Sequence, residues 1–300
     1  MPSWQSRVIR LYLNYLKATT DWNAPIEKLR QATDGAARQS DFPKSVQAQL
    51  IKIENFPAEW LIPSQANTNL AILYLHGGGF ATGSIKSHRA IVGRIAEASN
   101  IRALLIEYRL APEHPFPAAI EDALFAYEWL WENGYKKIVV VSDSAGGSLA
   151  LSLVTSLRDK KLPIPLLVVC MSPLIDVEGT GESVIANAKR DPWLKVEAKN
   201  IFKYYIGQNN PRNPLISPLY ADYKNFPPLL IFVGADEIML SDSTRLAEKA
   251  KNAGVDVQIK IWEGMWHVFP FFAPFVPESL KAINEIGDFI KSKVDDTKTA

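Results

Sequence analysis

Short apolar runs alternate with longer amphipathic stretches along most of this chain, and this alternation constrains its fold more than any other feature. Six runs have the length and the β-branched content of buried strands: 70–75, 102–107, 137–141, 165–171, 228–234 and 255–262. Stretches with helical spacing lie between or after them, near 87–99, 117–133, 145–160, 241–253 and 277–293. Repeated β-α-β order predicts an α/β fold, a mostly parallel sheet with helices on both faces. Residues 46–53 and 57–62 are expected to add an antiparallel edge.

Two segments fall outside this alternation. Residues 1–45, the N-terminal segment, have the spacing of two helices, and residues 177–217, the inserted segment, carry aromatic side chains without the alternation of strands. We expect both segments to form a helical cap, the second as an insertion in one α/β domain that spans residues 46–300.

The charge and cysteine content argue against several classes of protein. The chain has 33 basic and 32 acidic residues, a net charge of +1, so no basic surface predicts nucleic-acid binding. Cys170 is the single cysteine; it excludes an internal disulfide framework, suits a cytoplasmic location and is expected to pack in an apolar strand. No spacing of cysteine or histidine indicates a metal site.

The first predicted helix is amphipathic. Its apolar side chains recur at helical spacing, at Val8, Leu11, Tyr12, Tyr15 and Leu16. Arg7, Arg10 and Lys17 interrupt any continuous apolar core, which argues against a signal peptide and a membrane span. We expect no stable membrane insertion and a helix that packs its apolar face on the body of the protein; a helix on a membrane surface is the alternative.

Polar residues follow three of the predicted strands. Ser144 comes after 137–141, Asp236 after 228–234 and His267 after 255–262. Binding and catalytic groups of open parallel sheets gather at the carboxyl ends of the strands. A serine hydroxyl becomes a nucleophile when an imidazole accepts its proton and a carboxylate orients that imidazole. The order Ser, Asp, His therefore predicts a catalytic triad.

Other residues compete for the histidine and carboxylate positions. Of the four histidines only His267 follows the last strand; His88 is expected to be a surface or capping residue, and His114 lies in a proline-bracketed loop. Glu237 and Asp242 are alternatives to Asp236, which we favour because it comes earliest after the strand.

Three serines crowd the segment after 137–141. Ser144 falls at the turn between strand and helix, whereas Ser142 still belongs to the strand and Ser148 lies about one turn into the helix. A nucleophilic serine commonly occupies the centre of G-x-S-x-G, and here Ser142 stands where the first glycine is usual. We expect the close approach of strand and helix to tolerate this one added hydroxymethyl group, because Ser142 is small.

A glycine loop, HGGGF at 76–80, directly follows the first parallel strand. Glycines allow backbone N–H groups to approach a reacting oxygen closely. We expect Gly78, Gly79 and the N–H group of Ala145 to form an oxyanion hole. Four aromatic residues are expected to line the substrate pocket, with packing inside the cap as the alternative: Phe80, Trp193, Tyr204 and Tyr205.

These motifs resemble the hormone-sensitive-lipase-like branch of the α/β-hydrolase carboxylesterases. The resemblance rests on HGGGF, on YRLAPEHPFPAA at 108–119, on SDSAGGSLA at 142–150, and on GADEIMLSDS at 234–243 followed by MWHVF at 265–269. It implies an α/β-hydrolase fold with a helical cap and a triad of Ser144, His267 and Asp236. It further implies hydrolysis of short- to medium-chain esters through an acyl-enzyme, without metal or organic cofactor.

Other functions compete with this interpretation. A lactone hydrolase on the same scaffold is one. A dinucleotide-dependent NAD(P) reductase is another, because the glycine loop follows a strand and Tyr220 precedes Lys224 by four residues, but prolines at 218 and 227 prevent that pair from lying within a helix. A ligand-binding protein without activity would not be expected to keep all the triad and oxyanion residues.

The strict alternation in 255–262 predicts an exposed edge strand that pairs two chains in a homodimer.

Overall fold

The structure is a computed structural model that describes residues 1–21, 24–37, 42–54 and 56–299. This part of the chain contains one eight-stranded sheet in the order β1-β2-β4-β3-β5-β6-β7-β8. The strands are β1 Val46–Ile53, β2 Phe56–Pro63, β3 Asn67–Leu75, β4 Ile101–Ile106, β5 Lys137–Asp143, β6 Leu167–Met171, β7 Leu229–Gly234 and β8 Val257–Trp262. Strand β2 pairs antiparallel with β1 and β4, and all other pairs are parallel, which confirms the predicted α/β fold and its antiparallel edge.

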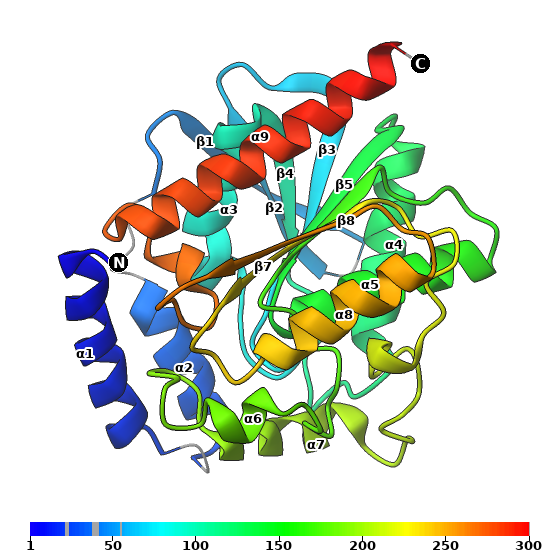
Figure 1. The fold of residues 1–300 in the computed structure, drawn as a ribbon. Helices are drawn as coiled ribbons and strands as arrows, with labels where there is room; N and C mark the ends of the chain where they lie inside the picture. Colours follow the sequence, from blue (N-terminus) through cyan, green and yellow to red (C-terminus); the bar gives the residue numbers. More distant parts are fainter. Residues whose placement is uncertain (22–23, 38–41, 55, 300) are drawn as a thin grey trace.

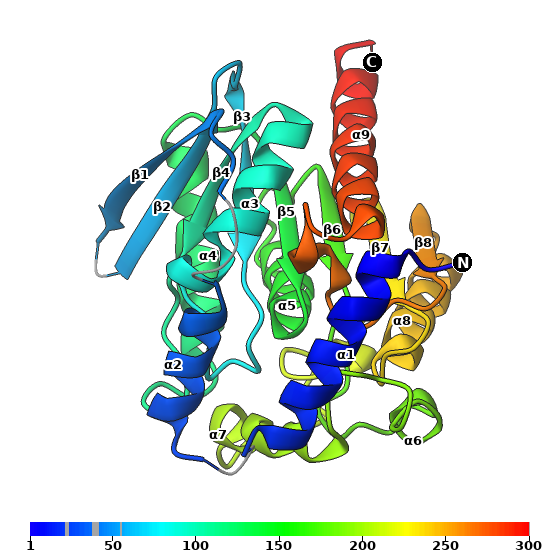
Figure 2. The same ribbon diagram turned by 90° about the vertical axis from the view of Figure 1, so that its left-hand side faces the viewer.

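Helices cover both faces of the sheet (Figures 1 and 2). Helices α3 Ile85–Ser99 and α9 Pro277–Thr299 pack on one face, and α4 Ala118–Glu132, α5 Ala145–Asp159 and α8 Leu240–Asn252 pack on the other. Successive side chains of a strand point to opposite faces. In β5, Val139 and Val141 therefore join the apolar cluster under α3 and α9, while Val140 joins the cluster under α4 and α5. Burial on both faces explains the continuous apolar runs in the sequence.

The two segments outside the alternation are helical. The N-terminal segment contains α1 Trp4–Thr19 and α2 Ile26–Ala37. The inserted segment contains α6 Ser183–Ala186, the 3₁₀ helix η1 Val196–Ile201 and α7 Phe202–Ile206. Both lie against loops that follow the carboxyl ends of strands: Arg10 of α1 contacts Asp236 after β7, and Ile201 of η1 lies over Gly79 after β3.

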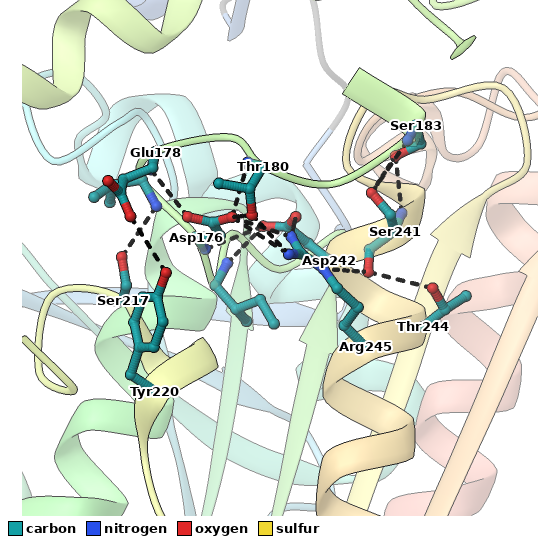
Figure 3. Close-up of polar contacts among 12 residues, drawn as sticks. Asp176, Glu178, Thr180, Ser183, Ser217, Tyr220, Ser241, Asp242, Thr244 and Arg245 are labelled. Carbon is teal, nitrogen blue, oxygen red and sulfur yellow. Dashed lines mark hydrogen bonds and ion pairs between the residues drawn. The ribbon is translucent and has the colours of Figure 1, made fainter. Parts of the chain in front are cut away.

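A polar cluster fastens the base of the inserted segment to α8 (Figure 3). The Arg245 guanidinium lies 2.7 Å from the carboxylate of Asp242 and 3.3 Å from that of Asp176, and both carboxylates are buried. Asp176 also accepts hydrogen bonds from Thr180, and Val177 donates its N–H group to Ser217. The two ends of the inserted segment are thus tied to each other, and Asp176, directly before the segment, is tied to α8.

Candidate active site

Ser144 occupies the sharp turn between β5 and α5. Its backbone angles, φ 50° and ψ −122°, are rare for a residue with a side chain. Three hydrogen bonds hold this conformation: the Ser144 N–H group donates to Met171, and the Ser144 carbonyl accepts from Gly147 and Leu174, each at 2.9 Å. The turn aims a partly exposed hydroxyl away from the sheet, as expected for a nucleophile elbow.

Small residues beside Ser144 allow the strand and the helix to approach each other. A Cβ atom added at Gly146 would lie 2.0 Å from the carbonyl oxygen of Leu75 at the end of β3, a distance that no side chain tolerates. Ser142 is fully buried, and its hydroxyl donates to the carbonyl oxygen of Val169 at 3.2 Å. Ser148 is buried within α5 and donates to Ile216 at 3.3 Å. Neither Ser142 nor Ser148 contacts a histidine; of the three serines, Ser144 does.

His267 lies in the loop after β8 with both ring nitrogens engaged. Its Nε2 atom is 3.0 Å from Ser144 Oγ, and its Nδ1 atom is 2.7 Å from Glu237 Oε2. Glu237 carries negative charge, so an Nδ1–H group donating to it leaves the Nε2 lone pair free for the serine proton. The structure therefore brings Ser144, His267 and Glu237 into one chain of hydrogen bonds.

The expectation that Asp236 orients His267 is wrong in this structure, because the adjacent Glu237 takes that place. After β7 the backbone stays paired with the end of β8 and the loop that follows it: Ala235 donates to Trp262 at 2.9 Å and Asp236 donates to Met265 at 3.1 Å. This pairing directs the Asp236 side chain to Arg10 and Arg190, with which it forms ion pairs. The longer Glu237 side chain reaches back under the imidazole.

Ser172, which the sequence interpretation missed, supports both the histidine and its carboxylate. Its hydroxyl donates to Glu237 Oε1 at 2.7 Å and accepts from the Val268 N–H group at 3.0 Å. The Gly234 N–H group donates to the same Glu237 oxygen at 2.7 Å. Val268 adopts φ 46°, an outlier for a β-branched residue, so the loop is held in a strained conformation next to His267.

The surroundings of His267 raise its pKa above the ordinary value of 6.5. Burial alone would lower the pKa, but the hydrogen bond and the negative charge of Glu237 outweigh it, with smaller contributions from Asp191 and Asp143. The imidazole is consequently a stronger base than a free histidine. Cys170, by contrast, is inert: burial raises the pKa of its thiol to about 12.

The glycine loop after β3 lies against Ser144. A Cβ atom added at Gly77 would lie 2.9 Å from Ser144 Cβ, and Gly78 and Gly79 have φ 112° and 63°, which favour glycine. Within the described residues, no hydrogen-bond acceptor is found for the N–H groups of Gly78, Gly79 or Ala145. Unpaired N–H groups beside a nucleophile are the donors that an oxyanion requires.

Asp143 fastens this loop to the sheet. The buried Asp143 carboxylate accepts from Tyr74 OH at 2.9 Å and from the Gly77 N–H group at 3.0 Å, and His88 Nε2 lies 3.4 Å away. Burial alone would raise the pKa of Asp143, but the contacts with His88 and Tyr74 hold it below its ordinary value. The expectation of a surface or capping role for His88 is wrong: it is buried beside Asp143.

The four predicted pocket residues have different surroundings. Trp193 places its ring edge-on to His267, with the ring centroids 6.3 Å apart, so it borders the site. The buried rings of Phe80 and Tyr205 stack on each other at 3.8 Å and join the glycine loop to α7. Tyr204 is 47% exposed on the outside of α7. Trp193 fits the predicted pocket, whereas Phe80 and Tyr205 fit the alternative of packing.

Asp242 and Tyr220, for which the sequence suggested other roles, lie in the polar cluster of Figure 3, at the base of the inserted segment. Asp242, the second alternative acid, accepts from the N–H groups of Ile175 and Asp176 and pairs with Arg245. The Tyr220 hydroxyl donates to Glu178 at 3.2 Å. Asp242 thus anchors the inserted segment, and Tyr220 has no part in a reductase-like tyrosine–lysine pair.

Comparisons with known proteins agree with this arrangement. Residues 72–271 match the family model described as the alpha/beta hydrolase fold. The chain is 34% identical to an acetyl-hydrolase of Streptomyces hygroscopicus over 90% of this chain and 91% of that one. It is 35% identical to an esterase of Acinetobacter venetianus over 92% and 94%.

The structural comparison points to the same group. The crystal structure of an esterase from the bacterial hormone-sensitive lipase family superposes with a TM-score of 0.94 at 38% identity, covering 98% of this chain and 99% of that one. Sequence and structure agree over nearly the whole chain. The chain therefore belongs to the hormone-sensitive-lipase-like esterases of the α/β-hydrolase fold.

Proposed function

We propose that the chain is a serine carboxylesterase that hydrolyses short- to medium-chain esters with a triad of Ser144, His267 and Glu237. The observation that carries the proposal is the continuous relay from Ser144 Oγ through His267 to Glu237, with distances of 3.0 and 2.7 Å. The esterase and acetyl-hydrolase names of the relatives support the reaction class. The acid of the triad is Glu237 and not Asp236.

The reaction proceeds in two halves. Ser144 Oγ attacks the ester carbonyl carbon while His267 Nε2 takes the hydroxyl proton, and the intermediate collapses as His267 returns that proton to the leaving alcohol. A water molecule, deprotonated by His267, then attacks the acyl-enzyme, which releases the acid and restores the serine. Glu237 holds the imidazole tautomer and stabilises the imidazolium in both halves.

The carbonyl oxygen becomes negatively charged in each intermediate. We infer that the N–H groups of Gly78, Gly79 and Ala145 stabilise it, because they lie beside Ser144 and lack acceptors in the described residues. Loss of one such donor in other enzymes costs roughly 10²–10³ in rate. The Asp143 contacts, which hold Gly77 in place, preorganise this hole.

The substrate preference follows from the two helical segments, which we propose form the cap of the pocket. Gly79 lies so close to Ile201 that an added Cβ would be 2.6 Å from Ile201 Cγ2, and Trp193 borders His267 on another side. Such close walls favour short to medium acyl groups. Initial rates on p-nitrophenyl esters from two to sixteen carbons, with one lactone added, test this preference; a faster rate on the longest ester would contradict it.

Replacement of the nucleophile tests the mechanism. Ser144→Ala should abolish turnover of p-nitrophenyl acetate, by roughly 10⁶ if the triad acts as a unit. An organophosphate should label Ser144 in the parent and in Ser148→Ala, the matched control, and label nothing in Ser144→Ala. Labelling that persists in Ser144→Ala would show that another residue is the nucleophile.

Two further proposals concern assembly and location. Strand β8 is an edge strand whose burial alternates over 257–260, and Ile261 is 46% exposed, so we propose a homodimer that pairs two β8 edges. Light scattering at micromolar concentration checks it, and a monomeric mass would contradict it. In the described residues no helix is long and apolar enough to span a bilayer. A cytoplasmic location stays a prediction from the single cysteine.

A further inference from the structure

Helix α1 carries apolar side chains on two opposite faces. On its inner face Leu13 is buried in the apolar cluster under α3 and α9, and Ile9 and Leu16 pack against that cluster. On its outer face five large side chains are exposed: Trp4 at 71%, Val8 at 53%, Leu11 at 71%, Tyr12 at 47% and Tyr15 at 64%. The inner face makes the contacts with the body of the protein. The expectation that the face with Val8, Leu11, Tyr12 and Tyr15 packs there is therefore wrong, because these side chains are exposed.

The five exposed residues form one continuous stripe, the outer stripe. An α-helix turns by about 100° per residue, so positions 4, 8, 11, 12 and 15 fall within an arc of about 100°, whose centre lies about 150° around the helix from Leu13. Monomeric proteins rarely expose apolar patches above about 300–600 Å², and five large side chains exposed by roughly half or more reach that range. Figure 2 shows α1 on the outside of the molecule, along the edge of the inserted segment.

The composition of α1 fits an anionic lipid surface. The helix contains no acidic residue, and Arg7 is exposed beside the outer stripe. The other two basic residues, Arg10 and Lys17, lie on the inner side and do not face the stripe. Trp and Tyr rings favour the boundary between lipid headgroups and acyl chains, and basic residues attract anionic lipids. The inserted segment next to it has six basic and four acidic residues. Two copies of α1 packed face to face would offer Arg7 of each copy no acidic partner on the other helix, which disfavours a second copy as the occupant.

We propose that the outer stripe of α1 docks the protein reversibly on the surface of anionic lipid bilayers, without insertion across them. The polar contacts of α1 lie on the inner side, so docking leaves them intact. Arg10 contacts Asp236 and the carbonyl oxygens of Arg190 and Gly264, and Lys17 contacts the carbonyl oxygens of Ala188 and Asp191. Docking therefore holds the inserted segment and the triad loops at a fixed height beside the bilayer.

Vesicle binding tests this proposal independently of the ester reaction. The full chain is mixed with phosphatidylglycerol vesicles or phosphatidylcholine vesicles and sedimented. We expect binding to phosphatidylglycerol that weakens in high salt and is much weaker on phosphatidylcholine. Leu11→Glu should weaken binding about tenfold or more, because it replaces an exposed apolar side chain of the stripe by a negative charge.

Leu50→Glu is the matched control, since Leu50 on β1 is 69% exposed and lies outside the stripe. Leu50→Glu should bind the vesicles as the parent does. Both variants should hydrolyse a soluble short ester at the parent rate, and this rate shows that they are folded. Absence of vesicle binding in the parent would overturn the proposal, as would equal weakening by both substitutions. Light scattering could also show a dimer that Leu11→Glu converts to a monomer. This result would overturn the lipid proposal, because the outer stripe would then bind a second copy of the chain.

Discussion

Two neighbouring carboxylates, Glu237 and Asp236, show how differently the body of the protein and its helical segments hold their polar groups. Glu237 is fully buried and accepts from Ser172, Gly234 and His267, all anchored in the sheet or its loops. Asp236 is held by arginines of the N-terminal and inserted segments, whose side chains are 26% and 59% exposed. One carboxylate orients a catalytic group, and the other attaches the covering segments.

The two carboxylates differ in how many hydrogen bonds from the sheet and its loops hold them. A group fixed by several short hydrogen bonds within the sheet loses its geometry only if the sheet does, which suits an orienting residue. A group held by long, partly exposed arginine side chains permits the covering segments to shift without disturbing the relay. Substitution of Glu237 should therefore mainly lower catalysis, and substitution of Asp236 should mainly lower stability.

The largest expected difference is in kcat. Glu237→Gln should lower kcat by about 10³–10⁴, because an amide neither stabilises the imidazolium nor favours the Nδ1–H tautomer. Asp236→Asn, the matched variant one residue earlier, should stay within about tenfold of the parent. Both are measured on p-nitrophenyl acetate with purified, folded protein. If Asp236→Asn proved the more damaging of the two, the assignment of the acid would be reversed.

The pH dependence of kcat/KM should also test whether Glu237 is the acid of the triad. His267 must be neutral to act as a base, so kcat/KM should fall about tenfold per pH unit below its pKa, with a midpoint above 6.5. Glu237→Gln removes the largest influence that raises this pKa and should move the midpoint to lower pH, whereas Asp236→Asn should leave it in place. Rates on an ester with an uncharged chromophoric product give the profile. A midpoint that Glu237→Gln does not move would show that Glu237 has no electrostatic effect on His267.

Much of this arrangement could be predicted from the sequence. Apolar runs of strand length specify the sheet because both of its faces are covered, and Ser144 and His267 each had few competitors at a strand end. The acid was missed because hydrogen bonds from Ala235 and Asp236 to the histidine loop decide which side chain turns inward. Those bonds join residues about 30 positions apart and leave no local pattern. The burial of His88 depends in the same way on a distant partner, Asp143.

Replacement of Asp236 should weaken the attachment of the N-terminal and inserted segments. Asp236→Asn leaves Arg10 and Arg190 without a charged partner, and because both arginines are partly exposed we expect a cost of about 1–2 kcal/mol. In thermal unfolding this corresponds to a Tm lowered by about 2–4 °C. Arg212→Met, which removes the exposed pair with Glu178, is the control and should change the Tm by less. Equal effects would mean that Asp236 contributes no more than a surface pair.

The last substitution concerns Ser142, which stands where glycine is usual. Its hydroxyl is satisfied by the Val169 carbonyl, and Ser142 is fully buried within β5. Ser142→Gly removes one hydrogen bond and adds chain flexibility, so it should cost about 1–2 kcal/mol of stability. Its kcat on p-nitrophenyl acetate should stay within about tenfold of the parent, since the turn at Ser144 keeps its own three backbone bonds. Ser148→Ala, which removes a hydrogen bond to the inserted segment, is the control with the same expected rate. A loss of turnover in Ser142→Gly as deep as in Ser144→Ala would mean that the Ser142 hydroxyl, and not the turn alone, holds the nucleophile in place.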